Sequence, residues 1–202
     1  MQKSSLNILH LSDLHLRRDG ADALAAKIFN ASKGTSSPVL VPKVILVTGD
    51  IFDGPLFASG DYREAIENAV AFFTSLTSSF DIEDFSKQLF FVPGNHEIHR
   101  QSIKDGKSEE RFNRYREFLA EIYAEKWDGL VGSIYDEEHL CYVKHFDEEN
   151  LILVGLVSPH YEKSKKKDAT KDELIETALI GDTQIRTMHQ KIMGITKAFA
   201  RK

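Results

Sequence analysis

Three short apolar runs, separated by segments of helical character, set the tightest limits on the fold of this chain. Residues 6–11, 44–48 and 89–92 are rich in Leu, Ile, Val and Phe and end at polar or turn-forming residues, a pattern typical of buried strands. Between them, residues 21–31 are helical in composition and residues 62–76 place apolar side chains at helical spacing. Strands that alternate with helices predict an α/β fold, with a parallel or mixed sheet flanked by helices.

The second half of the chain continues in a similar way. Residues 140–143 and 151–157 are two further predicted strands, separated by a polar turn at residues 147–150. Residues 110–123 place apolar side chains on one helical face. Residues 182–199 do the same, with Ile185, Met188, Ile192 and Ile195 on the predicted apolar face. Exposed loops are predicted at residues 17–22, 98–107 and 162–172.

Composition excludes several classes of protein. A chain of 202 residues fits a single domain, residues 1–202, with a sizeable apolar core. A net charge of -5 argues against a general affinity for nucleic acid or anionic membrane, although the lysines of residues 162–172 leave phosphate-backbone contact open. The apolar runs are too short to span a bilayer. The single cysteine, Cys141, predicts a reducing compartment, the cytoplasm.

Polar side chains of metal-binding type follow the first two predicted strands directly. Asp13 and His15 follow the first strand, and residues at i and i+2 of an extended chain point the same way, so both can reach one ion. Gly49 permits a tight exit from the second strand. Asp50, which comes next, is a lone carboxylate suited to bridging two cations.

A third polar cluster follows the third predicted strand. There Asn95 offers an amide oxygen as a metal ligand, and His96 is a proton donor or a charge stabiliser, with Glu97 next to it. In open α/β sheets, ligand sites form at the carboxyl ends of the strands. We therefore expect the three clusters to form one site.

The mixture of predicted ligands limits the metal. Carboxylate and amide oxygens combined with imidazole nitrogen suit Mn, Fe or Zn and suit Ca poorly. A ligand set without thiolates excludes a structural zinc finger. A carboxylate shared by two ions about 3.5–4 Å apart is the usual arrangement for hydrolysing phosphate esters. The sequence thus predicts two divalent transition metals and a phosphoester substrate.

The three motifs, Asp-Leu-His at 13–15, Gly-Asp at 49–50 and Gly-Asn-His-Glu at 94–97, resemble the pattern of the calcineurin-like metallophosphoesterases. The resemblance implies a four-layered α/β/β/α sandwich and hydrolysis of a phosphomonoester or phosphodiester. By residue, it implies that Asp13 and His15 bind the first metal, that Asp50 bridges, that Asn95 binds the second metal, that His96 contacts the scissile phosphate and assists the leaving group, and that Glu97 orients His96.

The resemblance covers the N-terminal portion of that catalytic domain. The family adds a later strand that ends in a ligand histidine, and then a Gly-His-x-His motif that does not occur in this sequence. His160 is the best internal substitute, whereas His189 lies within a predicted helix and is expected to be an ordinary surface or boundary residue. We therefore expect the domain to be incomplete at its C-terminal strands, with a further segment or another chain completing the site.

Two alternative functions follow from the same residues. If the site is incomplete, the chain is a catalytically inactive binding or regulatory fragment of such an enzyme. Alternatively, it is a nuclease of the same superfamily, because residues 8–16 also resemble the opening of some DNA-repair nucleases.

Overall fold

The computed structural model describes residues 6–17, 20–33, 40–105, 107–136, 138–158 and 180–199. The chain forms two compact units, Met1–Ala124 and Glu125–Lys202, and each is described by itself below. His160 and the lysine-rich segment 162–172 lie outside the described residues. The interpretation of residues 1–202 as one domain stays a prediction, as do the four-layered arrangement and the missing C-terminal strands.

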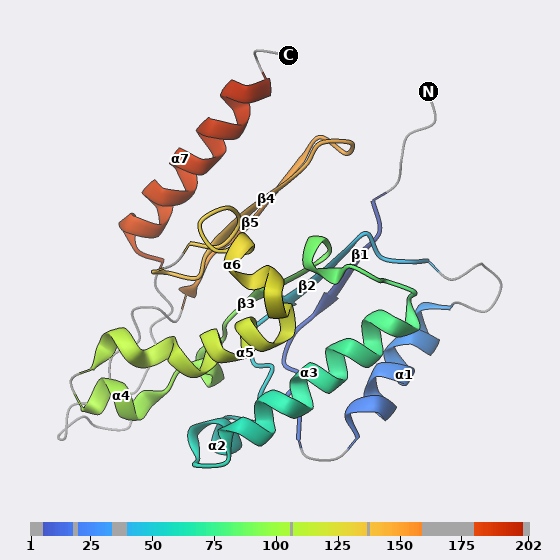
Figure 1. Cartoon of the computed structure of the whole chain (residues 1–202), viewed down its shortest axis with the longest axis vertical. Helices are drawn as coiled ribbons and strands as arrows, with labels where there is room; N and C mark the ends of the chain where they lie inside the picture. The colour runs from blue at the N-terminus through green and yellow to red at the C-terminus, as the bar shows by residue number, and fades with distance from the viewer. Residues whose placement is uncertain are drawn as a thin grey trace, which may run out of the picture. The chain divides into compact units, whose positions relative to one another are not determined.

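A parallel three-stranded sheet organises the first unit. Its strands β1 (Ile8–Leu11), β2 (Val44–Thr48) and β3 (Leu89–Val92) lie in the order β1-β2-β3, which confirms the three predicted strands. Helices α1 (Ala21–Ser32) and α3 (Tyr62–Ser79) lie between successive strands along the chain and pack on one another (Figure 1). The predicted α/β fold with a parallel sheet and flanking helices is therefore correct.

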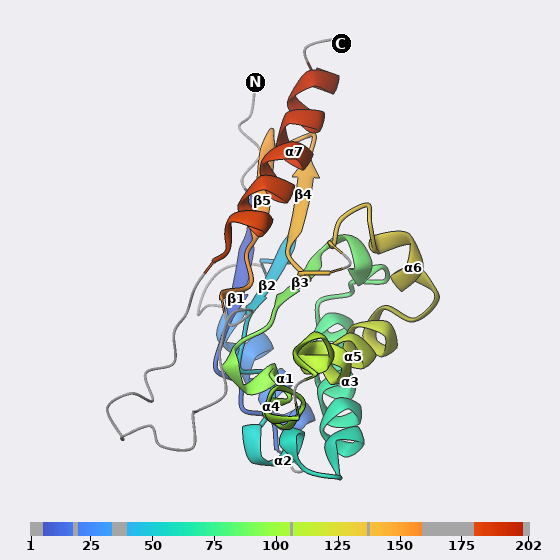
Figure 2. The same cartoon turned by 90° about the vertical axis from the view of Figure 1, so that its left-hand side faces the viewer.

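Aromatic side chains fill the core of this unit. Phe73 of α3 and Phe118 of α5 (Asn113–Tyr123) both contact Phe91 of β3, with ring centroids 4.9 and 5.1 Å apart. Helices α3 and α5 accordingly lie on the same side of the sheet (Figure 2). The Tyr123 hydroxyl also donates to the Leu89 carbonyl at 2.6 Å. The apolar faces predicted for residues 62–76 and 110–123 are the ones that supply this core.

Short helices occur in segments where no helix was predicted. The predicted loop 98–107 contains α4 (Arg100–Lys104), and the last two residues of the predicted loop 17–22 belong to α1. In the first case the chain turns because the Ser102 amide donates to the His99 carbonyl at 3.0 Å, and their side chains also bond at 2.6 Å. Further short elements are α2 (Gly54–Ala58), α6 (Trp127–Leu130) and 3₁₀ helices at Phe85–Lys87, Asn95–Glu97, Ser108–Phe112 and Ala124–Lys126.

The second unit contains an antiparallel hairpin of β4 (Tyr142–Phe146) and β5 (Leu151–Gly155), joined by the predicted polar turn. The predicted strand 140–143 starts two residues late, because Leu140 adopts a φ of 56° and its amide donates to the Asp136 carbonyl at 3.0 Å. Gly155 lies beneath the Tyr142 ring, where any side chain would collide with the ring.

Helix α7 (Asp182–Phe199) packs against β4 in this unit (Figure 1). Met188 is buried as predicted, but the placement of Ile185 on the apolar face was wrong, since 51% of it is exposed. Gln184 is buried instead, and its amide group both donates to the Val157 carbonyl (2.9 Å) and accepts from the Val157 amide (3.0 Å). Satisfying these backbone groups beyond the end of β5 turns the adjacent Ile185 outward.

His189 is exposed, as predicted. Within the ranges that the structure describes, no helix is both long enough and apolar enough to cross a lipid bilayer.

Candidate metal centre

The loops that follow the three parallel strands leave the sheet at the same edge. Backbone hydrogen bonds join the first loop to the second: the Asp13 amide donates to the Gly49 carbonyl at 3.2 Å, and the His15 amide donates to the Asp50 carbonyl at 3.0 Å. The residues of the first two predicted motifs are therefore held side by side by the backbone itself.

The second and third loops pack backbone against backbone. A Cβ atom added to Gly49 would lie 2.6 Å from the Cα of Gly94, and a Cβ added to Gly94 would collide with the Asp50 carboxylate. Gly49 also has a φ of +84°, which side chains rarely tolerate. Both glycines are thus required for the close approach that brings Asp50 to the third loop.

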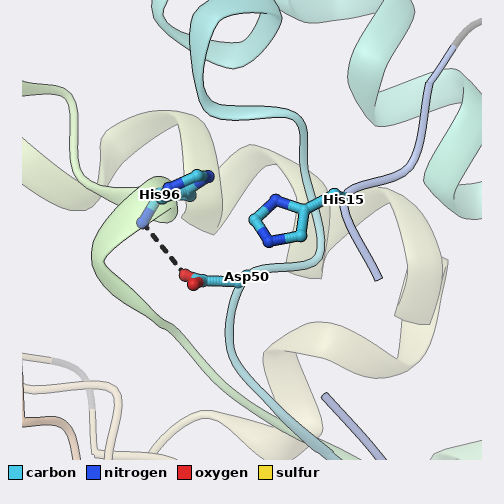
Figure 3. A group of neighbouring side chains, drawn as sticks. All are labelled: His15, Asp50 and His96. Carbon is cyan, nitrogen blue, oxygen red and sulfur yellow. Dashed lines mark hydrogen bonds between the residues drawn. The ribbon is translucent and has the colours of Figure 1, made fainter. Parts of the chain in front are cut away.

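Three side chains converge where these loops meet. The potential ligand atoms of His15, Asp50 and His96 all lie within 4.8 Å of one another (Figure 3). The two imidazole rings meet edge to face, with centroids 4.8 Å apart, and the Asp50 carboxylate accepts a hydrogen bond from the His96 backbone amide at 3.2 Å. This His15–Asp50–His96 cluster contains two predicted metal ligands and the predicted catalytic histidine.

The other two predicted ligands are not members of this cluster. The side chain of Asp13 is exposed, although its backbone is tied to the second loop as described above. Asn95 is partly buried and begins the 3₁₀ turn that contains His96. Metal binding by Asp13 and Asn95 stays a prediction.

Three of the predicted metal ligands share an unusual backbone conformation. Asp13, His15 and Asp50 have φ values of 53°, 43° and 52°, in the left-handed region that residues other than glycine rarely adopt. Such conformations cost on the order of 1 kcal/mol or more each and persist only where the surrounding structure imposes them, most often at functional sites. The strain therefore coincides with the predicted metal ligands.

Glu97, the residue after His96, is fully buried. Its Oε2 accepts hydrogen bonds from the amides of Gly94 (2.6 Å) and Asp50 (2.9 Å), and its Oε1 accepts from those of Ile51 (2.9 Å) and Phe52 (3.2 Å). Burial raises the pKa of Glu97 to about 7, against the opposing effect of the hydrogen bonds from Gly94, Phe52 and Asp50.

None of these four hydrogen bonds goes to the imidazole of His96, so the orienting role assigned to Glu97 stays a prediction. Three of the four contacts that Glu97 does make were not foreseen, because they go to backbone amides more than forty residues away in the sequence. The adjacency of Glu97 to the Gly-Asn-His motif was the only signal for this residue.

Gly54, the first residue of α2, was also missed. A Cβ atom at this position would lie 2.8 Å from the Nδ1 and 3.1 Å from the Cγ of His96, so the glycine backbone lies against that edge of the ring. The Nδ1 atom is buried and has no hydrogen-bond partner among the residues that the structure describes. Nε2 is therefore the nitrogen through which His96 can reach a ligand.

These features define an α/β protein in which side chains that could hold a metal ion lie at the carboxyl edge of a parallel sheet. Comparison with protein families sharpens this description, because the model of the calcineurin-like phosphoesterases matches residues 6–187. The chain belongs to that family, whose members are hydrolases that use divalent metals. Comparisons with curated proteins and with solved structures found no match.

Proposed function

We propose that this protein hydrolyses a phosphomonoester or phosphodiester, with two divalent metals held in part by His15 and Asp50. The observation that carries the proposal is the convergence of His15, Asp50 and His96 at the carboxyl edge of the sheet, in a chain of the calcineurin-like phosphoesterase family. Three separate loops contribute to this cluster, and none of its members is fully exposed.

The residues of the cluster fit a transition metal. One imidazole and one carboxylate within 4.8 Å of each other are a donor pair typical of Mn, Fe or Zn. By likeness to the family, Asp50 would bridge the two metals, Asp13 would join His15 at the first, and Asn95 would bind the second. When bound, such metals activate water and neutralise the charge of phosphoryl oxygens.

His96 is the proposed proton donor. With Nδ1 closed off by Gly54, Nε2 of the protonated ring can hydrogen-bond to a phosphoryl oxygen and pass its proton to the oxygen of the leaving group. Loss of this proton leaves His96 as a neutral imidazole, which then takes up a proton from solvent. The backbone bond from His96 to the Asp50 carboxylate keeps the proton donor next to the metal ligand.

Hydrolysis of aryl phosphates in the presence of Mn²⁺ tests this function. The wild-type protein should release nitrophenol from an aryl phosphate monoester or diester above a metal-only blank. His96→Ala should reduce turnover by about 100-fold or more, as loss of a general acid does. Asp50→Ala should reduce it at least as much, because it removes the proposed bridging metal ligand. Glu121→Ala removes a carboxylate that pairs with Arg63 on the surface, and it should leave turnover unchanged. Full activity in either Asp50→Ala or His96→Ala would reject the assignment.

Adding a DNA-degradation assay and a metal-binding measurement separates the alternatives. Degradation of DNA strands without turnover of small esters would favour the nuclease, in which nucleic acid is the substrate despite the acidic balance of the chain. Metal binding without any turnover would favour the inactive fragment, whose site another segment or chain completes. The cytoplasmic location stays a prediction from the single cysteine.

A further inference from the structure

The carboxylate of Glu97 makes contacts that the proposed reaction does not use. Each of its oxygens accepts two backbone N–H groups, at 2.6 and 2.9 Å for Oε2 and at 2.9 and 3.2 Å for Oε1. The side chain has no exposed surface, so these bonds replace the hydration that the carboxylate has in water. A buried carboxylate without such partners is strongly unfavourable, so Glu97 can be buried as a carboxylate only with these four donors.

The donors belong to both loops that flank the metal site. Three of them are the consecutive amides of Asp50, Ile51 and Phe52, and the fourth is the amide of Gly94. Glu97 therefore links the loop after β2 to the loop after β3 through a single rigid group. We call this set of four hydrogen bonds the Glu97 clamp.

Asp50 needs such a support. Its φ of 52° is unfavourable for a residue other than glycine, and a strained loop relaxes unless neighbouring groups hold it. The clamp bonds the Asp50 amide directly, while the Asp50 carboxylate accepts from the His96 amide on the other loop. Both ends of Asp50 are thus fixed relative to the third loop.

We propose that Glu97 is a positioning residue for the metal ligand Asp50, acting through the backbone of residues 50–52 and Gly94 rather than through the ring of His96. This inference rests on the proposed function, since it takes Asp50 to bind metal. Residues that orient metal ligands typically change metal affinity by about 10–100-fold when they are replaced.

The geometry makes glutamine a sharp test. Glu97→Gln keeps the shape of the side chain but leaves only one oxygen, so its NH₂ group must face one of the two pairs of backbone N–H donors. One pair then loses its acceptor, and the loop that carries Asp50 is released on that side.

Titration calorimetry with Mn²⁺ measures the effect. Glu97→Gln should bind Mn²⁺ about 10-fold or more weakly than the wild type. Its turnover should recover as Mn²⁺ is raised, whereas that of His96→Ala should not. The matched control is Thr77→Val, which removes a buried hydroxyl that donates to the Phe73 carbonyl in α3, away from the loops, and it should keep wild-type affinity. Wild-type Mn²⁺ affinity in Glu97→Gln would overturn the proposal.

Hydrogen exchange of the metal-free wild-type protein tests the clamp without any variant, in case Glu97→Gln fails to fold. The amides of Asp50, Ile51, Phe52 and Gly94 should exchange slowly although they lie outside regular strands and helices. Exchange at the rate of open loops would overturn the proposal. If the wild type bound no Mn²⁺, the proposed function and the effect on affinity would both be overturned, while protected amides would show that the clamp itself exists.

Discussion

The residues of the candidate centre combine chemical suitability with an unfavourable backbone. Asp13, His15 and Asp50 are three of the seven non-glycine residues with positive φ among those that the structure describes. The first loop shares backbone bonds with the second, and Glu97 bonds the second to the third, so each strained residue is held by a neighbour. Of these three residues, His15 and Asp50 direct their side chains toward the same cluster, at a cost in stability.

This strain predicts an unusual order of stability at position 15. In the middle of a helix or strand, a glycine variant is normally less stable than the alanine variant by about 0.5–1 kcal/mol. At position 15, where φ is 43°, the glycine variant should be the more stable of the two. The free energy of unfolding of His15→Gly should therefore exceed that of His15→Ala by about 1 kcal/mol. Both variants lose the imidazole, so the comparison isolates the backbone.

Chemical denaturation of the two metal-free variants gives the required difference. Equal stabilities, or a more stable alanine variant, would show that His15 carries no backbone strain. The same pair at position 27, where Lys27 lies within α1, should show the normal order with alanine more stable.

At the scale of elements, the sequence predicted what periodicity can reveal. A periodic pattern of apolar residues is visible in strands β1 to β3 and in helices α1, α3, α5 and α7, because these elements are long or apolar enough. The edge of the sheet at which the candidate metal ligands meet followed from the parallel order of the strands. Helices α2, α4 and α6 have only four or five residues, too few for a helical period to stand out.

Other features depend on contacts between distant parts of the sequence. Three such features can be predicted only when the folded backbone is known. They are the contact of Gly54 with His96, the hydrogen bonds of Glu97, and the burial of Gln184 where Ile185 was predicted to be buried. Sequence patterns record the burial of apolar residues, and they do not record which backbone amides need an acceptor. The sequence therefore predicted that His15, Asp50 and His96 lie at one edge of the sheet, but it did not predict the contacts that support them.

The turn that precedes β4 is an element with a testable dependence on pH. Asp136 accepts hydrogen bonds from the backbone amide (2.8 Å) and the ring Nδ1 (2.9 Å) of His139, which is buried. Burial raises the pKa of Asp136, but the hydrogen bonds and electrostatic attraction of His139, with a further contribution from Lys191, outweigh burial and lower the net pKa. A lowered pKa in the folded state means that this carboxylate stabilises the protein above its usual pKa and loses that effect as the pH falls through the lowered value.

Asp136→Asn should therefore be less stable than the wild type at neutral pH, by about 1 kcal/mol, the contribution of a typical hydrogen bond. The difference in melting temperature should shrink as the pH falls below the ordinary range of aspartate. Asp128→Asn, at an exposed position in α6, serves as the control and should show little difference at any pH. If the difference in melting temperature between Asp136→Asn and the wild type grew as the pH fell, the stabilising role of the Asp136 carboxylate would be contradicted.

At the scale of the whole molecule, the family match extends over both compact units, since it covers residues 6–187. The His15–Asp50–His96 cluster lies entirely within the first unit, so its geometry follows from that unit alone. Because a metal bound only by the native state stabilises the fold by mass action, metal binding and folding of that unit should be linked.

The proposed function requires that His15 and Asp50 bind a divalent metal at the edge of the parallel sheet. Anomalous diffraction from a crystal soaked in Mn²⁺ tests it most directly, because it locates the ion among the side chains. We expect an anomalous peak in contact with the His15 imidazole and the Asp50 carboxylate, and its loss in Asp50→Ala. A protein that binds Mn²⁺ in solution and shows peaks only at other carboxylates, with none between His15 and Asp50, would contradict the claim.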